Sequence, residues 1–277
     1  MAIELLLGAL VSAAPIMLAA YGELVLERAG RVNLGVDGMM ALGASVAVIT
    51  ASLSSPSLGL AAGALAGLLV SLFYALPVVY FRADQVVAGL SLAFLAWGLA
   101  DLVATLGLPL SAPIPRGSPL HSLLLLLSVL LPLALWAFLY LTWPGVELRA
   151  IGYDEGAAKN RGARVERARL LSALFGGLMA GLAGAYMSLV LYNGKYFTGI
   201  TSGWGWLAVG SVILGYWHPL GVALSSYAVG LVLSLRPYLE ALGLGPLSVS
   251  APYLVVILAL ALSALVTRRL KLRPPAT

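Results

Sequence analysis

A single stretch of charge interrupts an otherwise apolar chain, and this contrast restricts the possible folds more than any other feature. Of the 277 residues, 61% are hydrophobic and only 10% are charged, whereas a soluble domain carries roughly 25% charged residues. The one long polar segment is residues 143–170, WPGVELRAIGYDEGAAKNRGARVERARL. The apolar stretches on either side of this segment are long enough to cross a membrane. They predict an all-α polytopic membrane protein, because only helices or closed barrels satisfy the backbone hydrogen bonds in lipid.

The polar segment contains the signature of a very short helix. Asp154 can accept free backbone N–H groups at a helix start, and Gly162 can adopt the left-handed conformation that ends it. The residues between them give only about two turns, and so short a helix needs a surface to lie on. Ala157 and Ala158 would allow close approach to a groove in another protein. The alternative is a loop that only orients the chain, and the segment alone favours it because charge runs usually mark solvated faces.

Apolar stretches predict about nine membrane segments. Seven are expected to span the membrane: 3–20, 58–80, 85–106, 120–142, 170–192, 220–235 and 253–267. The other two, 39–53 and 203–215, are shorter than the roughly 20 residues of a straight span, so we expect them to be broken, tilted or re-entrant. Residues 21–39 and 236–252 read as polar connections, the latter with a short helix at 238–242. Glycines at 59, 63 and 67 predict a helix-packing face.

The 16 lysines and arginines predict an orientation. If residues 143–170 lie in the cytoplasm, only Arg116, Lys195 and Arg236 fall outside, and the other 13 lie inside. This bias predicts an N-terminus outside and a C-terminus in the cytoplasm. The sequence therefore describes a single transmembrane domain, residues 1–277, with a basic cytoplasmic tail at 268–277.

The residues exclude several kinds of chemistry. The chain has no cysteine, and neither His121 nor His218 has a second ligand at metal spacing, so we expect no metal site. It also lacks a P-loop and any catalytic Ser/His/Asp or His-Glu-x-x-His set. We therefore expect no catalytic residue, and a membrane enzyme is the least favoured function. The acids Asp37, Asp84 and Asp101 lie near predicted span ends, where water or headgroups reach them.

Aromatic residues gather around the short segment 203–215. They are Trp204, Trp206, Trp217, Tyr192 and Tyr196. Such a cluster is either a belt at the membrane interface or a stacking surface for a sugar or a base, and the belt is the more common arrangement.

Three stretches together resemble one family of membrane proteins. The first, residues 22–44, contains Asn33-Leu34-Gly35 and Gly38-Met39; the second, RAIGYDEGAAKNRG at 149–162, precedes a glycine-rich span; the third, residues 203–221, ends in a Trp-x-Pro-x-Gly turn. They resemble permease subunits of ABC importers for simple sugars, nucleosides and branched-chain amino acids, most closely the shorter permease of nucleoside-type importers. Asp37 stands where Glu is more frequent in that family.

This resemblance implies a non-catalytic permease of the cell membrane that forms the translocation path for a nucleoside or simple sugar by alternating access. Partner ATPase subunits would bind ATP and Mg, so no cofactor is expected in this chain and no nucleic acid among its partners. An extracytoplasmic binding protein would deliver the substrate. A second permease would complete the pore, as a heterodimer by resemblance, with a homodimer as the alternative.

The resemblance also implies two sets of site residues. The ATPase-coupling set is Arg149, Gly152, Asp154, Glu155, Ala157, Ala158 and Gly162. The translocation-path set is Asn33, Gly35, Gly38, Met39, Trp204 and Trp206. The residues alone leave one other transporter class open, a stand-alone secondary transporter driven by an ion gradient. Asp101 and the two short segments would suit it, whereas the lack of clear mid-span charges counts against it.

Overall fold

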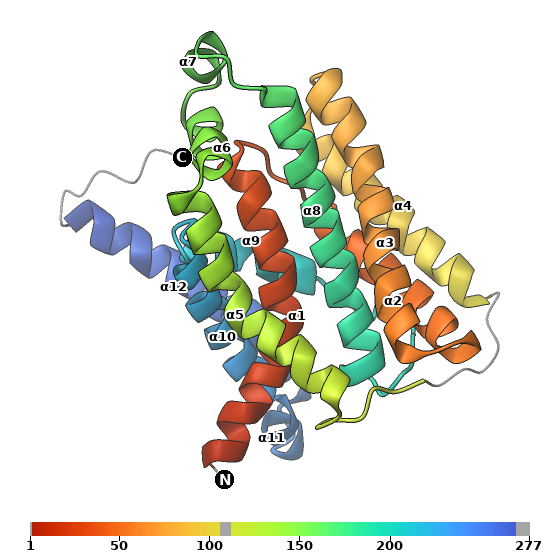
Figure 1. Cartoon of the computed structure of the whole chain (residues 1–277). Helices are drawn as coiled ribbons and strands as arrows, with labels where there is room; N and C mark the ends of the chain where they lie inside the picture. Colours follow the sequence, from red (N-terminus) through yellow and green to blue (C-terminus); the bar gives the residue numbers. More distant parts are fainter. Residues whose placement is uncertain (1, 106–111, 270–277) are drawn as a thin grey trace.

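The computed structural model describes residues 2–105 and 112–269, and all the regular structure within them is helical. The helices, drawn in Figure 1, are α1 (Ala2–Arg28), α2 (Val36–Leu53), α3 (Pro56–Ala75), α4 (Gln85–Thr105), α5 (Pro119–Leu141), α6 (Trp143–Tyr153), α7 (Glu155–Asn160), α8 (Val165–Tyr186), α9 (Trp204–Leu214), α10 (Pro219–Ser234), α11 (Arg236–Ala241) and α12 (Gly245–Arg269). Helices α3 and α8 each continue into a π turn, Leu76–Tyr80 and Met187–Leu191.

Eight helices in the described part of the chain are long and apolar enough to cross a membrane. Helix α9 has only 11 residues and does not reach that length. The predicted short segment at 203–215 is therefore confirmed. The other one, at 39–53, starts three residues earlier than predicted and forms the 18-residue α2. The predicted all-helical membrane class is confirmed.

Two predicted connections are wrong. Residues 21–28 were expected in a polar loop, but they extend α1 to Arg28. Glu23 is buried there, at 1% exposure, and its Oε2 accepts the backbone N–H of Asn33 at 3.2 Å. Residues 245–252 begin α12 and include Pro252 within the helix. The short helix predicted at 238–242 is present as α11, while residues 270–277 of the predicted tail lie outside the described residues.

Helices α2, α3 and α8 pack through glycine, and we call these three helices the glycine slab. A Cβ placed on Gly67 of α3 would lie 2.2 Å from the carbonyl oxygen of Gly177 in α8. One on Gly43 of α2 would lie 2.5 Å from the carbonyl oxygen of Gly181. The predicted glycine face of residues 59–67 is therefore a site of backbone-to-backbone contact.

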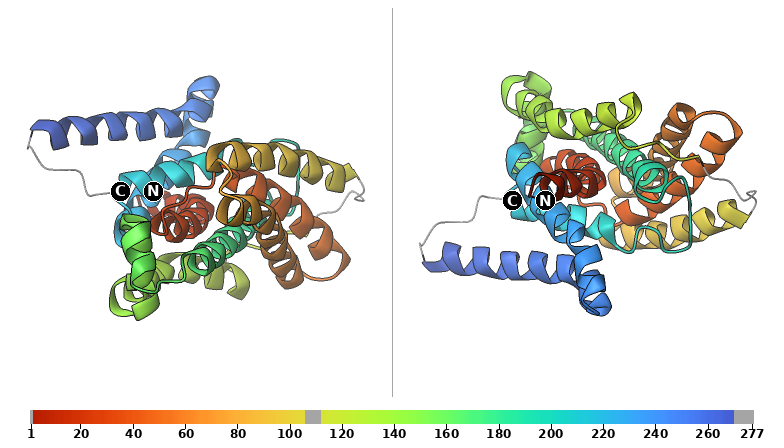
Figure 2. Two further views of the ribbon diagram at one scale, coloured as in Figure 1. Left: turned by 90° about the horizontal axis from the view of Figure 1, so that it is seen from above. Right: turned by 90° about the horizontal axis from the view of Figure 1, so that it is seen from below.

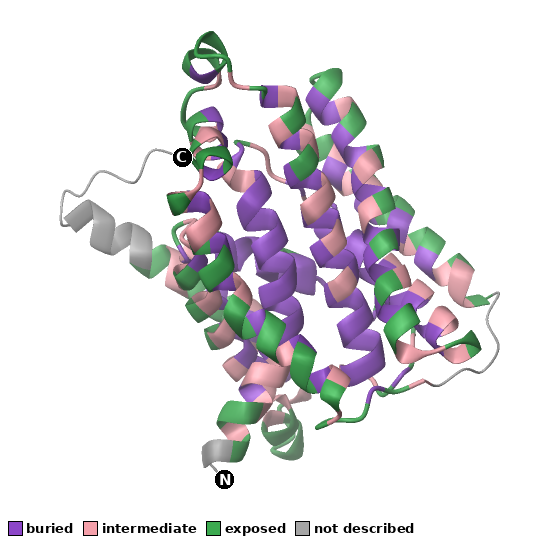
Figure 3. Ribbon diagram, viewed as in Figure 1, coloured by how far each residue is buried: buried purple, intermediate pink, exposed green. Residues whose placement is uncertain are grey.

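Helix α1 forms the centre of the bundle. It packs against α8 and α10 and also contacts α5 and α9, and Figure 3 shows most of its length buried. Helix α12 lies at the periphery and projects away from the other helices (Figure 2). Helix α1 is thus buried at the centre of the bundle, whereas α12 lies at its periphery and contacts few other helices.

Helices α2 and α9 both begin inside the bundle, and their first turns lie side by side. A Cβ on Gly205 in the first turn of α9 would lie 2.5 Å from the Cα of Asp37 in the first turn of α2. After α9, the chain returns to the end of α1, because Trp217 bonds to Glu27 there. We call the end of the bundle that carries α6 and α7 the α6–α7 end (Figure 1).

Candidate functional site

Helix α7 is built as the sequence predicted. The Asp154 carboxylate accepts the backbone N–H of Ala157 at 2.9 Å, which caps the helix start. Gly162 has φ +87, the left-handed conformation that turns the chain toward α8. With only six residues, the helix depends on its contacts for its stability.

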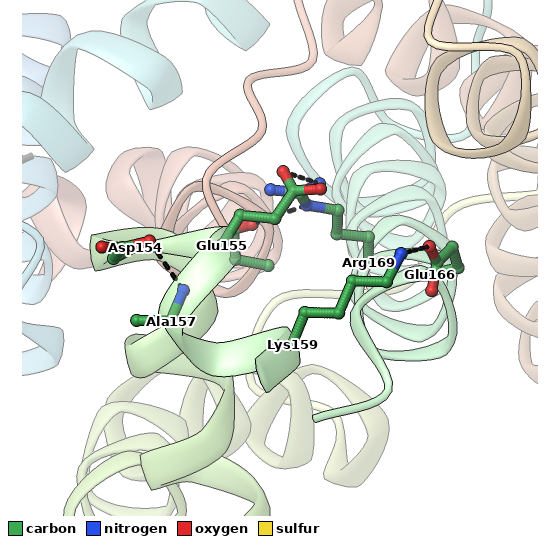
Figure 4. Close-up of polar contacts among 7 residues, drawn as sticks. Asp154, Glu155, Ala157, Lys159, Glu166 and Arg169 are labelled. Atoms are coloured by element: carbon green, nitrogen blue, oxygen red, sulfur yellow. Dashed lines mark hydrogen bonds and ion pairs between the residues drawn. The ribbon is translucent and has the colours of Figure 1, made fainter. Parts of the chain in front are cut away.

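One arginine fastens α7 to the rest of the bundle. The Arg169 Nη1 atom of α8 lies 2.7 Å from Glu155 Oε2 of α7, and its Nε donates to the carbonyl oxygen of Ala29 at 3.0 Å (Figure 4). The Arg169 side chain is 7% exposed. Its bond to Glu155 lowers the pKa of that carboxyl below its ordinary value. Arg169 therefore joins α7, α8 and the segment after α1.

Helix α6 is pressed against the end of α1. A Cβ on Gly152 would lie 2.3 Å from the carbonyl oxygen of Arg28, so only glycine fits there. Arg149 donates to the carbonyl oxygen of Leu139 at 3.0 Å, and its guanidinium lies 4.4 Å from the centre of the Tyr140 ring. Two of the predicted coupling residues, Arg149 and Gly152, thus make contacts within the chain.

The predicted coupling residues divide into an exposed and an inward-facing group. Asp154 and Ala157 are exposed, whereas Ala158 is buried against Ile151 and Val165. The exposed residues of α7 and of the end of α6 include Tyr153, Asp154, Gly156, Ala157 and Asn160. A docking role for these residues remains a prediction.

Asp37 joins four segments in the interior of the bundle. Its Oδ2 accepts the indole N–H of Trp97 at 3.1 Å and the hydroxyl of Thr201 at 2.7 Å, and its Oδ1 accepts the backbone N–H of Gly205 at 2.8 Å. The residue is 0% exposed. A carboxylate at the starts of both α2 and α9 is stabilised by the free N–H groups of helix N-termini.

A cavity of about 460 Å³ adjoins Asp37. Its walls include Asp37, Trp97, Asp101, Tyr196, Thr201, Trp206 and Tyr253. Trp97 and Trp206 meet edge to face, with ring centroids 5.7 Å apart. The Tyr196 hydroxyl donates to Asp101 at 2.7 Å. Aromatic walls with a few fixed polar groups suit an uncharged ring compound that carries hydroxyl groups.

A second cavity, of about 670 Å³, lies at the α6–α7 end. Its lining includes Glu27, Arg28, Arg31, Arg149 and Trp217. The Trp217 indole donates to Glu27 at 2.5 Å, and Arg28 Nε donates to the Trp217 carbonyl oxygen at 2.8 Å. Helix α9 therefore runs from one cavity to the other and is fastened by polar side chains at both ends.

Of the six predicted path residues, only Trp206 lines either of these cavities. Asn33, Met39 and Trp204 are buried, and Gly35 and Gly38 pack closely against Gly89 and Ala93 of α4. Asn33 shapes the turn before α2, because its Oδ1 accepts the N–H of Gly35 at 2.8 Å. The belt expected for the aromatic cluster also fails for Trp204, whose burial places it in the core.

Sequence reasoning missed the residues that hold this region together. Asp37 was treated as an acid near a span end, and Trp97, Thr201 and Arg169 were given no role. One signal was available for Asp37: an acid in the first turn of an unusually short apolar segment is placed to cap the start of a neighbouring helix. Thr201 and Trp97 carry no such signal, because their partner is remote in the sequence.

The described residues contain eight helices that are long and apolar enough to cross a membrane, and a half-length helix lies between two cavities. This arrangement is typical of multi-pass membrane transport proteins. Residues 5–267 match the family described as branched-chain amino acid transport system / permease component, and the chain belongs to that family.

The relatives agree with this assignment. The chain is 30% identical to the guanosine ABC transporter permease protein NupQ of Bacillus subtilis, over 91% of this chain and 89% of that protein. It is 29% identical to the nucleoside ABC transporter permease protein NupC of Lactococcus lactis, over 82% and 80%. It is 34% identical to TsgC13 of Haloferax volcanii, a permease whose assignment to glucose is provisional, over 87% and 80%. No solved structure matches the chain significantly.

Proposed function

We propose that this chain is the permease subunit of an ABC importer that carries a nucleoside or a simple sugar. The observation that carries the substrate class is the cavity beside Asp37, whose aromatic walls and fixed polar groups suit an uncharged hydroxylated ring. The relatives named for guanosine, nucleosides and glucose act on compounds of this kind. ATP and Mg bind to a partner ATPase, and this chain performs no catalysis.

The α6–α7 end faces the cytoplasm in this proposal, and the N-terminus lies outside. The basic residues support this orientation, since all but Arg116, Lys195 and Arg236 fall on the cytoplasmic side. The exposed surface of α7 then meets the ATPase. A binding protein delivers substrate from the other side.

Two chains of contacts connect that docking surface to the interior. The first runs from Glu155 of α7 to Arg169, and from Arg169 to the carbonyl oxygen of Ala29. Ala29 begins the short segment that leads into α2. A displacement of α7 therefore acts on the segment that positions Asp37.

The second chain of contacts begins on α6. Arg149 lies over the Tyr140 ring, the Tyr140 hydroxyl accepts from Arg28 at 3.4 Å, and Arg28 bonds to the carbonyl oxygen of Trp217. Trp217 follows the end of α9. The two chains of contacts thus lead to α2 and α9, whose first turns are joined by Asp37. Movement of the ATPases can therefore shift α2 and α9 together and open the passage to one side at a time.

A second permease completes the passage. Trp206, 39% exposed, belongs both to the wall of the cavity and to the surface of the chain. A partner packed against this face would close the open side of the cavity. By resemblance to nucleoside-type importers the partner is a different chain, which makes the pore a heterodimer.

The docking surface is tested by Ala157→Arg, which adds bulk and charge where close approach is required. We expect the variant to lose both copurification of the ATPase and substrate uptake. Ala83→Arg, at an exposed position between α3 and α4 at the same end, is the matched control and keeps both. If Ala157→Arg retains ATPase binding and uptake, the docking assignment is wrong.

The substrate class is tested through the partners. Purification of the tagged chain in mild detergent from its native cells should recover an ATPase, a second permease and a binding protein. A thermal-shift screen of that binding protein should respond to nucleosides or simple sugars. Recovery of the chain alone, with uptake that follows an ion gradient and ignores ATP, would contradict the proposal.

A further inference from the structure

A third hollow opens on the side of the bundle, apart from the two cavities that α9 connects. It is a groove of about 650 Å³ formed by α1, α5, α6 and α8; Figure 1 shows α5 and α8 on either side of α1. Its apolar walls are Val25, Leu135, Phe138, Leu148, Leu171 and Phe175. The lining also includes three charged residues, Arg164, Arg167 and Glu147. The groove therefore combines an apolar interior with a charged rim.

The guanidinium groups of the two rim arginines are unpaired in the part of the chain that the structure describes. Among the described residues, neither guanidinium makes a hydrogen bond or an ion pair, although other cations at this end do, such as Lys159 with Glu166 at 3.3 Å. Glu147 already accepts the backbone N–H of Arg164 at 2.9 Å through its Oε1. Two cations thus face one carboxylate, and the rim has an excess of positive charge.

The rim lies at the level of the lipid headgroups. Helix α8 with its π turn has 27 residues, about 40 Å at 1.5 Å per residue, against a hydrocarbon core of about 30 Å. The first turns of α8, with Arg167, therefore extend into the headgroup region. Trp143, 81% exposed just after α5, marks the same level because tryptophan favours the membrane interface. The apolar walls continue from there toward the hydrocarbon core.

We propose that this groove binds an anionic phospholipid from the leaflet at the α6–α7 end. An acyl chain lies along the apolar walls, and the phosphate lies between Arg164 and Arg167, whose planar guanidinium groups suit phosphate oxygens. The lipid touches α6 and α8, the two helices that flank α7. It therefore supports the segment that carries α7, whatever compound the protein transports.

The test is competition between two lipids that differ in headgroup charge. The full chain is reconstituted into vesicles of equal parts phosphatidylglycerol and phosphatidylcholine and extracted in mild detergent. The retained lipids are then counted by native mass spectrometry. Wild type should retain phosphatidylglycerol preferentially. Arg164→Gln with Arg167→Gln should reduce that preference at least about fivefold, since each basic residue near an anionic surface contributes measurably to the attraction.

A matched control removes the same charge from the same end of the bundle. Arg82 and Arg161 are exposed, and neither lines the groove. Arg82→Gln with Arg161→Gln should keep the wild-type preference. An unchanged preference in the groove variant, or an equal loss in both variants, would overturn the proposal. All four substitutions are at exposed positions, and unfolding temperatures verify that both variants fold.

A photoreactive residue at Leu171, introduced in native membranes, identifies what occupies the groove. A phospholipid adduct supports the proposal. An adduct with a second permease or with the ATPase would show that the groove is a protein interface, and the lipid site would then be rejected.

Discussion

The glycine slab and helix α9 are held in place by opposite means. In the slab, α2, α3 and α8 touch backbone to backbone over several turns, at glycines where no Cβ fits. Helix α9 is also buried and packs closely on α2 at Gly205, but polar side chains fasten both of its ends, Asp37 at its start and Glu27 with Arg28 after its end. The slab, packed through glycine over several turns, moves as a unit, whereas a helix whose two ends are fastened by hydrogen bonds can be repositioned when those bonds exchange.

The largest expected effect comes from adding a side chain inside the slab. In Gly67→Val the new Cβ would meet the carbonyl oxygen of Gly177 at 2.2 Å, and the next nearest atoms, Cα and N of Gly181 at 2.6 Å, are also backbone atoms that cannot move aside easily. We expect no folded protein in detergent, since overpacking of a tight core already costs about 1–3 kcal/mol where side chains can shift. Gly98→Val in α4, where a Cβ meets nothing within 4 Å, is the control and should fold normally. Normal yield and unfolding temperature of Gly67→Val would refute the slab description.

A smaller but still large effect is expected at the start of α9. Asp37→Ala leaves the donors of Trp97, Thr201 and Gly205 without a partner, and each buried unsatisfied group costs about 1–3 kcal/mol. We expect a lower unfolding temperature, faster proteolysis in residues 192–203 and loss of transport. Asp37→Asn keeps one carbonyl oxygen and should fall between wild type and Asp37→Ala. If Asp37→Ala matches wild type in all three measurements, α9 is not held by this carboxylate.

An intermediate effect, on coupling rather than folding, is expected at Arg169. Arg169→Gln removes the ion pair to Glu155 and weakens the link to Ala29. In the assembled importer we expect ATP hydrolysis to continue while transport per ATP falls severalfold. Lys159→Gln, which removes the more exposed ion pair to Glu166, should change little. Equal losses in both variants would show that α7 transmits nothing through Arg169.

The smallest effect is a dependence of stability on pH. Arg169 holds the pKa of Glu155 below its ordinary value of 4.5, so the ionised carboxyl stabilises the folded chain above that pH. This contribution is lost as the pH falls through the lowered pKa. The Glu155 side chain is 41% exposed, which keeps the effect small. Between about pH 5 and pH 3 the unfolding temperature of wild type should fall more steeply than that of Glu155→Gln; parallel curves would contradict this.

The contrast between the glycine slab and α9 also explains which features of the fold the sequence could predict. Apolar length and glycine spacing are local properties, so the presence of long apolar helices, the short α9 and the glycine face of α3 were predicted correctly, whereas the end of α1 and the start of α12 were not. The capped α7 was also predicted, because its cap residue Asp154 and its terminal Gly162 lie within ten residues of each other. Features set by local spacing can be inferred from one sequence.

Long-range polar contacts could not be predicted. The Asp37 and Thr201 side chains meet across 164 positions, and nothing in either local sequence points to the other. The polar, glycine-punctuated residues 21–39 suggested a loop, and only the folded chain reveals that Glu23 lies within α1 and accepts the N–H of Asn33. The inward-facing position of Ala158 likewise depends on Ile151 and Val165.

The shortness of α9 has a consequence for how the protein is made. A segment of 11 apolar residues is too short to remain in the bilayer by itself. Its polar anchors lie on α1 and α2, and its Trp206 packs against Trp97 of α4; all three helices leave the ribosome earlier. The first half of the chain must therefore be inserted and partly assembled before the second half is complete, and it serves as the template on which α9 is positioned.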